Sequence, residues 1–242
     1  MEPSVYRLMA QTQETHWWFE GRRAILSAII ARLGLPAGAQ ILEIGCGPGG
    51  NLRMLGQFGT VFGVEMDEYA RTRAREVSSC EIQSGSLPDR IPFGAQVFDL
   101  VCLLDVLEHV DDDAAALRAV AGRIKPGGFA LVTVPAYQWL YGAHDRLHHH
   151  VRRYSASCLS RKAADAGLQV RRLGYFNALL FPLIASVRLA KRILRLRESD
   201  EAVLPGKLLN GLLRRVFAAE AHFVPHMLFP FGTSCIAVLE RR

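Results

Sequence analysis

Residues 41–50 read ILEIGCGPGG, a short apolar run that ends in a loop of glycines. The apolar run predicts a buried strand, and the glycines allow a tight turn and a close approach of the backbone to a ligand. A second apolar run, TVFGVE over 60–65, ends in Glu65, about twenty residues downstream of the glycines. A carboxylate at the end of that strand can accept hydrogen bonds from both ribose hydroxyls of a bound nucleoside.

The alternation of strand and helix patterns continues along the chain. Further strands are expected at 80–83, 95–104, 129–135, 168–176 and 232–240, and helices at 50–57, 68–77, 113–124 and 155–166. Asp111 or Asp112 is expected to cap the helix that follows them. Such alternation predicts a parallel sheet with helices on both faces.

Composition sets the broad class of protein. The chain has 242 residues, 50% of them apolar and 21% charged, which indicates a globular protein. It lacks an 18-residue apolar run, and residues 1–20 lack the apolar core of a signal peptide. Five scattered cysteines are typical of a reduced, cytoplasmic protein. The net charge is −2 over residues 1–160 and +8 over 161–242, so the basic excess lies in the last third.

Four segments together resemble the class I S-adenosylmethionine-dependent methyltransferases, in particular types 11 and 12. They are LEIGCGPGG (42–50), VFGVEMD (61–67), FDLVCLLDVLEHV (98–110) and IKPGGFALVTVP (124–135). The resemblance implies an α/β fold with a doubly wound, seven-stranded, mostly parallel, Rossmann-like sheet whose last strand is antiparallel. It also implies transfer of the sulfonium methyl group of S-adenosylmethionine to an acceptor, with S-adenosylhomocysteine as product.

The same resemblance implies a set of cofactor contacts. The aminoacyl part would lie against the first glycine turn, the ribose at Glu65, the adenine between Met66 and the loop after the third strand, and the methionine end at the fourth strand. Ser86 stands where the family often has an aspartate. The residues assigned in this way are Glu43, Gly45, Cys46, Gly47, Glu65, Met66, Ser86, Leu87 and Leu104, with Asp105 bordering the methionine end.

Two other functions compete with a methyltransferase. A nicotinamide-dependent oxidoreductase would also place a carboxylate at Glu65, but it favours GxGxxG spacing, whereas this loop reads GxGxGG with Pro48 inside. A non-catalytic nucleoside-binding or scaffold protein would keep the pocket without turnover.

Histidines follow the fourth and fifth strands, at the sheet edge where ligands bind. His109 is a candidate general base, or it orders its own loop. The loop after the fifth strand is a candidate for catalysis and for binding an anionic acceptor, or it is merely solvated; its candidates are Tyr141 and His150 for catalysis and His144, Arg153 and Tyr154 for the acceptor. We expect no metal site in this protein. The strongest candidate, the run His148–His150, is disfavoured because consecutive side chains point in different directions.

The two regions outside the sheet motifs each have alternative roles. Residues 1–38 are interpreted as a helical lid, with Trp17 or Trp18, and by preference Trp18, at the cofactor and Arg22 or Arg23 near a carboxylate. Packing of the tryptophans on the sheet is the alternative. Residues 39–176 and 230–242 form the cofactor-binding core. Residues 177–229 form a helical cap that includes a basic face at Arg188, Lys191, Arg192 and Arg195.

The cap has three candidate partners. It packs on the sheet or forms a homodimer, or it contacts an anionic membrane surface or a lipid-like or isoprenoid acceptor. Nucleic acid is disfavoured, because aromatic and basic residues do not alternate there. The acceptor is expected to be a small organic molecule.

Overall fold

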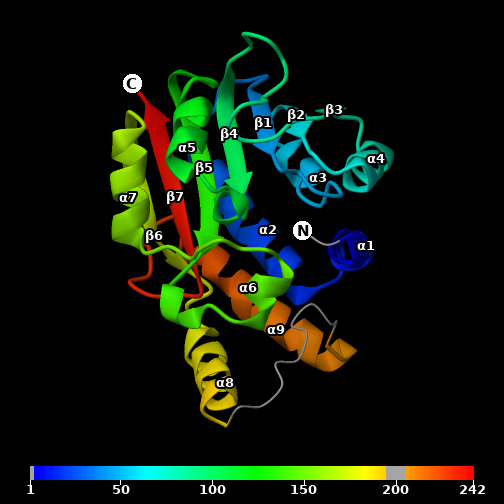
Figure 1. Ribbon diagram of the computed structural model, residues 1–242, viewed down its shortest axis with the longest axis vertical. Helices are drawn as coiled ribbons and strands as arrows, with labels where there is room; N and C mark the ends of the chain where they lie inside the picture. The colour runs from blue at the N-terminus through cyan, green and yellow to red at the C-terminus, as the bar shows by residue number, and fades with distance from the viewer. Residues whose placement is uncertain (1–2, 195–204) are drawn as a thin grey trace.

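The computed structural model describes residues 3–194 and 205–242, and its centre is one seven-stranded sheet (Figure 1). The strand order is β3-β2-β1-β4-β5-β7-β6, and β7 runs antiparallel to both of its neighbours, β5 and β6. This confirms the doubly wound, mostly parallel sheet. The strands are β1 Gln40–Ile44, β2 Thr60–Val64, β3 Glu81–Gln83, β4 Phe98–Leu104, β5 Ile124–Pro135, β6 Leu168–Phe176 and β7 Ser234–Arg241.

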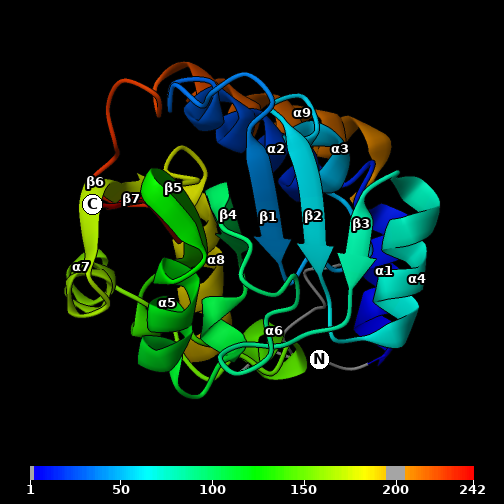
Figure 2. The ribbon, with the colours of Figure 1, turned by 90° about the horizontal axis from the view of Figure 1, so that it is seen from above.

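Helices cover both faces of the sheet (Figure 2). One apolar core joins α2, α3, α4 and α9 to one face, and a second joins α5 and α7 to the other. The helices are α1 Pro3–Thr12, α2 Trp17–Ile30, α3 Leu52–Leu55, α4 Glu68–Val77, α5 Asp113–Ala121, α6 Ala143–Leu147, α7 Ala156–Asp165, α8 Phe181–Ile193 and α9 Lys207–Ala219. Short 3-10 turns are η1 Leu107–His109, η2 Gln138–Leu140 and η3 Glu220–His222.

Polar side chains fix where the helices begin. Asp112 accepts a hydrogen bond from the Ala115 N–H at 2.8 Å and caps α5, as expected from the sequence. Asp67 caps α4 in the same way through the Ala70 N–H, at 2.8 Å. These caps also place negative charge at the positive ends of the helix dipoles.

The segment after β5 is more ordered than the loop predicted for it. It contains η2 and α6, because the buried Asp145 side chain accepts a hydrogen bond from the Gly142 N–H at 2.8 Å and closes the first turn of α6. The sequence pattern missed this helix because it is only five residues long.

The cap contributes a helix to the core. In α9, Phe217 is fully buried and packs so closely on α2 that a Cβ at Gly21 would lie 2.4 Å from its ring. Only glycine therefore allows this approach of α2 and α9. Arg195, expected on the basic face of the cap, lies outside the described residues. The boundaries at residues 38, 176 and 229 stay predictions.

Candidate active site

The glycine loop follows β1 directly and turns through the left-handed region. Gly45 and Gly47 have φ values of 74° and 54°, which side-chain-bearing residues rarely adopt. A Cβ at Gly45 would also lie 2.6 Å from Cγ2 of Val106. The loop needs glycine at these positions, which leaves its backbone open to a ligand.

Glu65 joins the end of β2 to this loop. Its carboxylate accepts hydrogen bonds from the Gly47 N–H and from the Asp67 N–H, each at 2.8 Å. The Tyr6 hydroxyl of α1 donates to the same carboxylate at 3.4 Å. Burial raises the pKa of Glu65, and the backbone hydrogen bonds oppose that shift. The carboxylate is thus a buried acceptor at the place where the sequence predicts a ribose.

Glu43 is a second buried carboxylate beside the loop. Its Oε1 accepts a hydrogen bond from Asn51 Nδ2 at 2.8 Å, and its Oε2 has no hydrogen-bond partner among the described residues. Burial raises the pKa of Glu43 to about 7, although the Asn51 bond lowers it. A buried oxygen without a partner is costly, so this position suits a donor such as the amino group of an aminoacyl ligand.

These features fit a sulfonium nucleoside as cofactor. The structure brings Glu43, Gly45, Gly47 and Glu65 together around one turn, with the Cys46 thiol buried behind it. Met66 is exposed beside Glu65, as an adenine contact requires. Ser86 pairs with Arg90 through both backbone hydrogen bonds, and Leu87 packs on the second core. Leu104 is buried at the end of β4.

Helix α1 covers the glycine loop, a contact that the sequence did not locate. Tyr6 reaches Glu65, and Gln13 Nε2 donates to the Pro48 carbonyl at 3.2 Å. The Met9 methyl lies 3.8 Å from the Cβ position of Gly47. The helical period of Tyr6, Met9 and Gln13, which places them on one face, is the signal that could have found them.

Trp18 packs on aromatic residues of the first core, and its contact with the cofactor stays a prediction. The Trp18 ring stacks on Phe217 at 5.1 Å and on Phe176 at 6.1 Å between centroids. Burying this large ring against two others is favourable and leaves it in the core between α2, α9 and the sheet. Arg22, one turn later, does reach a carboxylate and pairs with Asp105.

A group of histidines lies at the carboxyl ends of β4 and β5. The rings of His109 and His150 are 4.8 Å apart, and those of His144 and His148 are 4.2 Å apart, between centroids. His148 and His150 are 5.7 Å apart. The structure therefore joins the two histidine segments that the sequence predicted separately.

Asp145 holds one side of this histidine group. Its Oδ1 lies 2.8 Å from both His150 Nδ1 and Arg153 Nε. Burial alone would raise the pKa of Asp145, but these hydrogen bonds hold it well below its usual range. Asp145 was missed in the sequence, where it reads as part of a polar loop.

Burial and repulsion between neighbouring imidazoles lower the pKa of two of the histidines. Burial, followed by the nearby His150, lowers the pKa of His109 to about 4. Burial and the neighbouring histidines lower the pKa of His148 to about 3. Glu108, next to His109, is fully buried, and burial raises its pKa well above the ordinary value.

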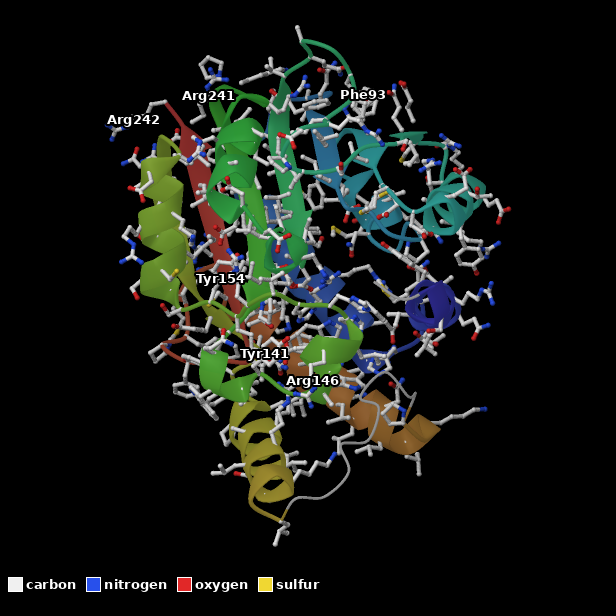
Figure 3. All side chains as sticks on the ribbon, viewed as in Figure 1. Phe93, Tyr141, Arg146, Tyr154, Arg241 and Arg242 are labelled. Atoms are coloured by element: carbon white, nitrogen blue, oxygen red, sulfur yellow. The ribbon has the colours of Figure 1, made fainter. Side chains whose placement is uncertain are left out.

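Three predicted residues of this loop hold the protein itself together. Arg153 binds Asp145 and the Ala136 carbonyl. Tyr154 is buried, and its hydroxyl donates to Asp113 at 2.8 Å and lies 3.2 Å from the Leu107 carbonyl. The acceptor contacts of both residues stay predictions. Tyr141 donates to the His150 carbonyl at 2.8 Å, near α6 (Figure 3).

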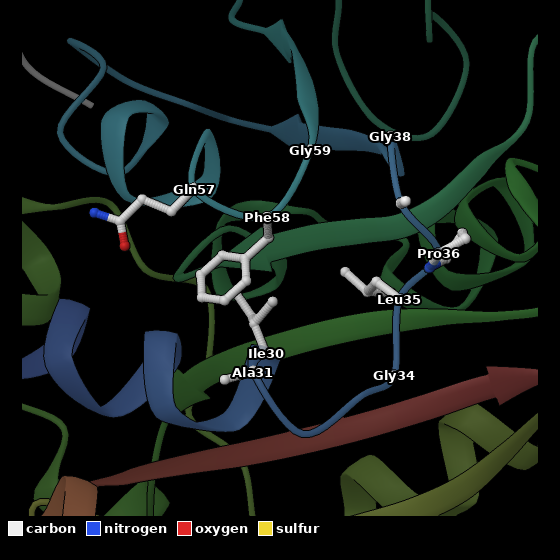
Figure 4. Close-up of a pocket in the computed structure, with 10 residues that line it drawn as sticks. Ile30, Ala31, Gly34, Leu35, Pro36, Gly38, Gln57, Phe58 and Gly59 are labelled. Atoms are coloured by element: carbon white, nitrogen blue, oxygen red, sulfur yellow. The ribbon is translucent and has the colours of Figure 1, made fainter.

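The hollow in Figure 4 is not this site. It is lined by residues that precede β1 and β2, including Leu35, Pro36, Gly38, Phe58 and Gly59. These are the amino ends of the strands, whereas ligands of doubly wound sheets bind at the carboxyl ends.

Comparison with known proteins shows which family the chain belongs to. A family model described as a methyltransferase domain covers residues 18–173. The chain belongs to this methyltransferase family. It is a class I methyltransferase, and S-adenosylmethionine is its cofactor.

Relatives of known activity are distant. The chain is 27% identical over 163 residues to cycloartenol-C-24-methyltransferase 1 of Oryza sativa subsp. japonica, covering 57% of this chain and 46% of the relative. It is 30% identical over 157 residues to the ubiquinone biosynthesis O-methyltransferase of Thiobacillus denitrificans, covering 57% and 67%. The match thus spans about half of the plant enzyme and two thirds of the bacterial one.

Solved structures share the fold. A methyltransferase from Haloferax volcanii, in a complex with the Trm112 methyltransferase activator, superposes with a TM-score of 0.63 at 19% identity, covering 98% of this chain and 92% of that one. An S-adenosylmethionine-dependent methyltransferase from Thermotoga maritima gives 0.60 at 18%, covering 98% and 99%. Among the described residues, the helices are too short or too polar to cross a membrane.

Proposed function

We propose that this methyltransferase methylates a hydroxyl group of a small organic acceptor with an apolar, lipid-like body. The observation that carries the proposal is the buried Asp145–His150 pair, which lies beside His109 at the carboxyl ends of β4 and β5. A hydroxyl must lose a proton as it is methylated, and an imidazole oriented by a carboxylate is suited to take it.

We assign the cofactor to the cradle formed by the glycine loop and the two glutamates. Bound S-adenosylmethionine supplies an activated methyl group on its sulfonium. Glu65 would hold the ribose, and Glu43 with Gly45, Cys46 and Gly47 the aminoacyl part. Met66, Ser86 and Leu87 would border the adenine, and Leu104 the methionine end. The buried, unpartnered Oε2 of Glu43 supports this placement.

The histidine group performs the acceptor chemistry in this proposal. Asp145 holds His150 by its Nδ1, so the opposite ring nitrogen is the one that can receive a proton. Tyr141 fixes the His150 backbone, and His144 packs on His148. Asp145 and Tyr141 are then positioning residues, while His109 and His150 would meet the acceptor. The fixed positions of these side chains would align the reacting atoms. Exclusion of water from the site would strengthen the electrostatic interactions between them.

An apolar acceptor fits the surface beside the site. Helices α8 and α9 lie at the end of the molecule toward which β4 and β5 point (Figure 1). Leu208 is 93% exposed on α9, and Leu183 of α8 is 59% exposed. Lys207 and Arg215 lie on α9 with Leu208. Apolar residues with cations beside them are typical of contact with an anionic membrane surface. The names of the two relatives also refer to a sterol and to ubiquinone biosynthesis.

Transfer of a labelled methyl group tests the acceptor proposal. We expect a phenol with a prenyl tail to react with a kcat/KM at least tenfold above that of the same phenol without the tail, because each buried CH₂ contributes about 0.8 kcal/mol. Asp145→Asn should lower kcat by about 100-fold with little change in KM for the phenol. Binding of S-adenosylhomocysteine without transfer to either phenol would instead support a non-catalytic binding protein.

Co-sedimentation with liposomes tests the membrane contact. We expect the chain to pellet with phosphatidylglycerol vesicles at low salt, and Leu208→Glu to abolish pelleting. The control is Val77→Glu, at an exposed valine of α4 away from the cap. Absence of pelleting, with a dimer in solution that Leu208→Glu disrupts, would favour a homodimer interface.

A further inference from the structure

Three side chains of metal-ligand type converge where η1 meets the loop after α6. Glu108 and His109 come from η1, and His150 comes from the loop. One potential ligand atom of each lies within 4.8 Å of the other two. The three residues thus offer two imidazole nitrogens and one carboxylate oxygen from two separate segments.

Glu108 gives the independent sign that something binds there. Its side chain is fully buried, and neither carboxylate oxygen has a hydrogen-bond partner among the described residues. A buried carboxyl group without a partner is strongly unfavourable unless a cation or donor satisfies it. Arg22 and Arg153 are near enough to lower the pKa of Glu108, but each already forms an ion pair with another carboxylate. Arg22 pairs with Asp105, and Arg153 pairs with Asp145.

The surrounding hydrogen bonds orient both rings as metal-binding histidines are usually oriented. Nδ1 of His150 lies 2.8 Å from Oδ1 of Asp145, and Asp145 is itself held by Arg153 and the Gly142 N–H, each at 2.8 Å. The His109 ring is hydrogen-bonded to the backbone of His149. Such outer contacts fix one ring nitrogen and leave the other for a metal ion.

We propose that Glu108, His109 and His150 bind one divalent transition-metal ion, for which Zn²⁺ is the best-matched probe. Two imidazoles and a carboxylate are a common zinc donor set that leaves a coordination position open. Bonds of about 2.0–2.2 Å would draw the ligand atoms to roughly 3.4 Å apart, so side-chain movements of about an ångström complete the site. This proposal departs from the expectation of no metal site, which the sequence supported only by weighing the run His148–His150; the present set takes one residue from that run and two from η1.

A bound ion would change how the acceptor loses its proton, a role that rests on the proposed methyl transfer. The open position can take the acceptor oxygen and lower the pKa of its hydroxyl. His109 and His150 then act as ligands. The proton of the hydroxyl is then released to solvent as the acceptor oxygen binds the ion as an anion. Binding of the ion itself does not depend on this role.

Metal stoichiometry and affinity test the site directly. The chain is prepared without a histidine tag, stripped with a chelator and titrated with Zn²⁺. We expect about one zinc per chain and a higher midpoint of thermal unfolding. Glu108→Gln and His150→Asn should each weaken zinc binding more than tenfold, and Asp145→Asn by about 10–100-fold. The control, His222→Asn at an exposed histidine of η3, should bind as the wild type does.

The proposal is overturned if the wild type binds no stoichiometric zinc, or if both ligand variants bind it unchanged. Titration with S-adenosylhomocysteine shows whether each variant is folded. If Glu108→Gln does not fold, the zinc affinity of His150→Asn alone tests the metal site. Methyl transfer without zinc binding would overturn the metal site and leave the proposed function. Zinc binding without methyl transfer would overturn the proposed function and leave the metal site. Equal transfer rates with and without zinc would overturn the acceptor role alone.

Discussion

Arg22 of α2 forms an ion pair with Asp105, the residue that follows β4 directly. Asp105 also accepts a hydrogen bond from the Thr133 hydroxyl at 3.0 Å and has a φ of 61°, so side chain and backbone are both held in one arrangement. The Arg22 side chain is 7% exposed. The pair therefore links the N-terminal helices to the strand end beside the cofactor and histidine groups.

Removing one member of this pair should destabilise the fold. Asp105→Leu leaves a buried guanidinium without its carboxylate, and we expect a loss of about 3 kcal/mol in the free energy of unfolding. The double variant with Arg22→Met should recover part of that loss, because an apolar pair replaces a desolvated ion pair, while the strain of leucine at a φ of 61° remains. Urea unfolding of the four proteins measures the coupling. Additive losses in the double variant would show that the two side chains do not interact.

Helix α1 should control how fast the cofactor leaves. Tyr6 of α1 contacts Glu65, Met9 lies over Gly47, and α1 also packs on α4. Removing residues 1–12 should raise the dissociation rate of S-adenosylhomocysteine by roughly tenfold, which corresponds to about 1.4 kcal/mol. Stopped-flow fluorescence measures this rate. Arg7→Ala, which removes the contact with the Tyr69 ring, should leave the rate unchanged. Equal rates with and without residues 1–12 would mean that α1 is not a lid.

The sheet could be predicted because each strand carries its own signal. The runs that end at Ile44, Val64 and Leu104 are buried on both faces and therefore read as continuous apolar segments. The glycine turn and Glu65 follow two of these strands directly, so local sequence also placed them at one edge of the sheet.

The histidine group could not be predicted as a unit, because its members come from different segments. Glu108 and Asp145 are charged residues, which are usually exposed, and only tertiary packing buries them. The sequence indicates only that each lies in a segment after the carboxyl end of a strand, where ligands of such sheets bind. For Trp18, the helical period along α2 predicts a buried face, but the sequence does not identify the residues on which that face packs.

Replacing Trp18 should affect stability and not cofactor affinity. Trp18→Ala removes a ring that stacks on Phe176 and Phe217, and we expect a loss of about 3 kcal/mol, or roughly 6–12 °C in Tm. The affinity of the folded protein for S-adenosylhomocysteine should stay within twofold of the wild type. Trp139→Ala, at an exposed tryptophan, is the control and should cost less than about 1 kcal/mol. A tenfold loss of affinity in Trp18→Ala would instead indicate that this ring contacts the cofactor.

Glu43 should make stability depend on pH. Because burial raises its pKa to about 7, the folded state favours the protonated carboxyl. Its stabilising contribution is complete below the ordinary pKa, near 4.5, and is lost as the pH rises to about 7, by roughly 3 kcal/mol in total. Glu43→Gln should remove this part of the slope. Urea unfolding of both proteins between pH 5 and 8 measures the difference, and identical slopes would contradict the assignment.

The same carboxyl group should link cofactor binding to proton release. An ammonium group beside Glu43 favours the ionised carboxylate, so binding must expel the proton that the buried carboxyl holds below about pH 7. We therefore expect the affinity for S-adenosylhomocysteine to rise by about tenfold per pH unit below pH 7 and to level off above it. Calorimetry at pH 6 in two buffers of different ionisation enthalpy should detect nearly one proton released per ligand bound. In Glu43→Gln both the slope and the released proton should disappear, whereas their persistence would place the amino group of the ligand elsewhere.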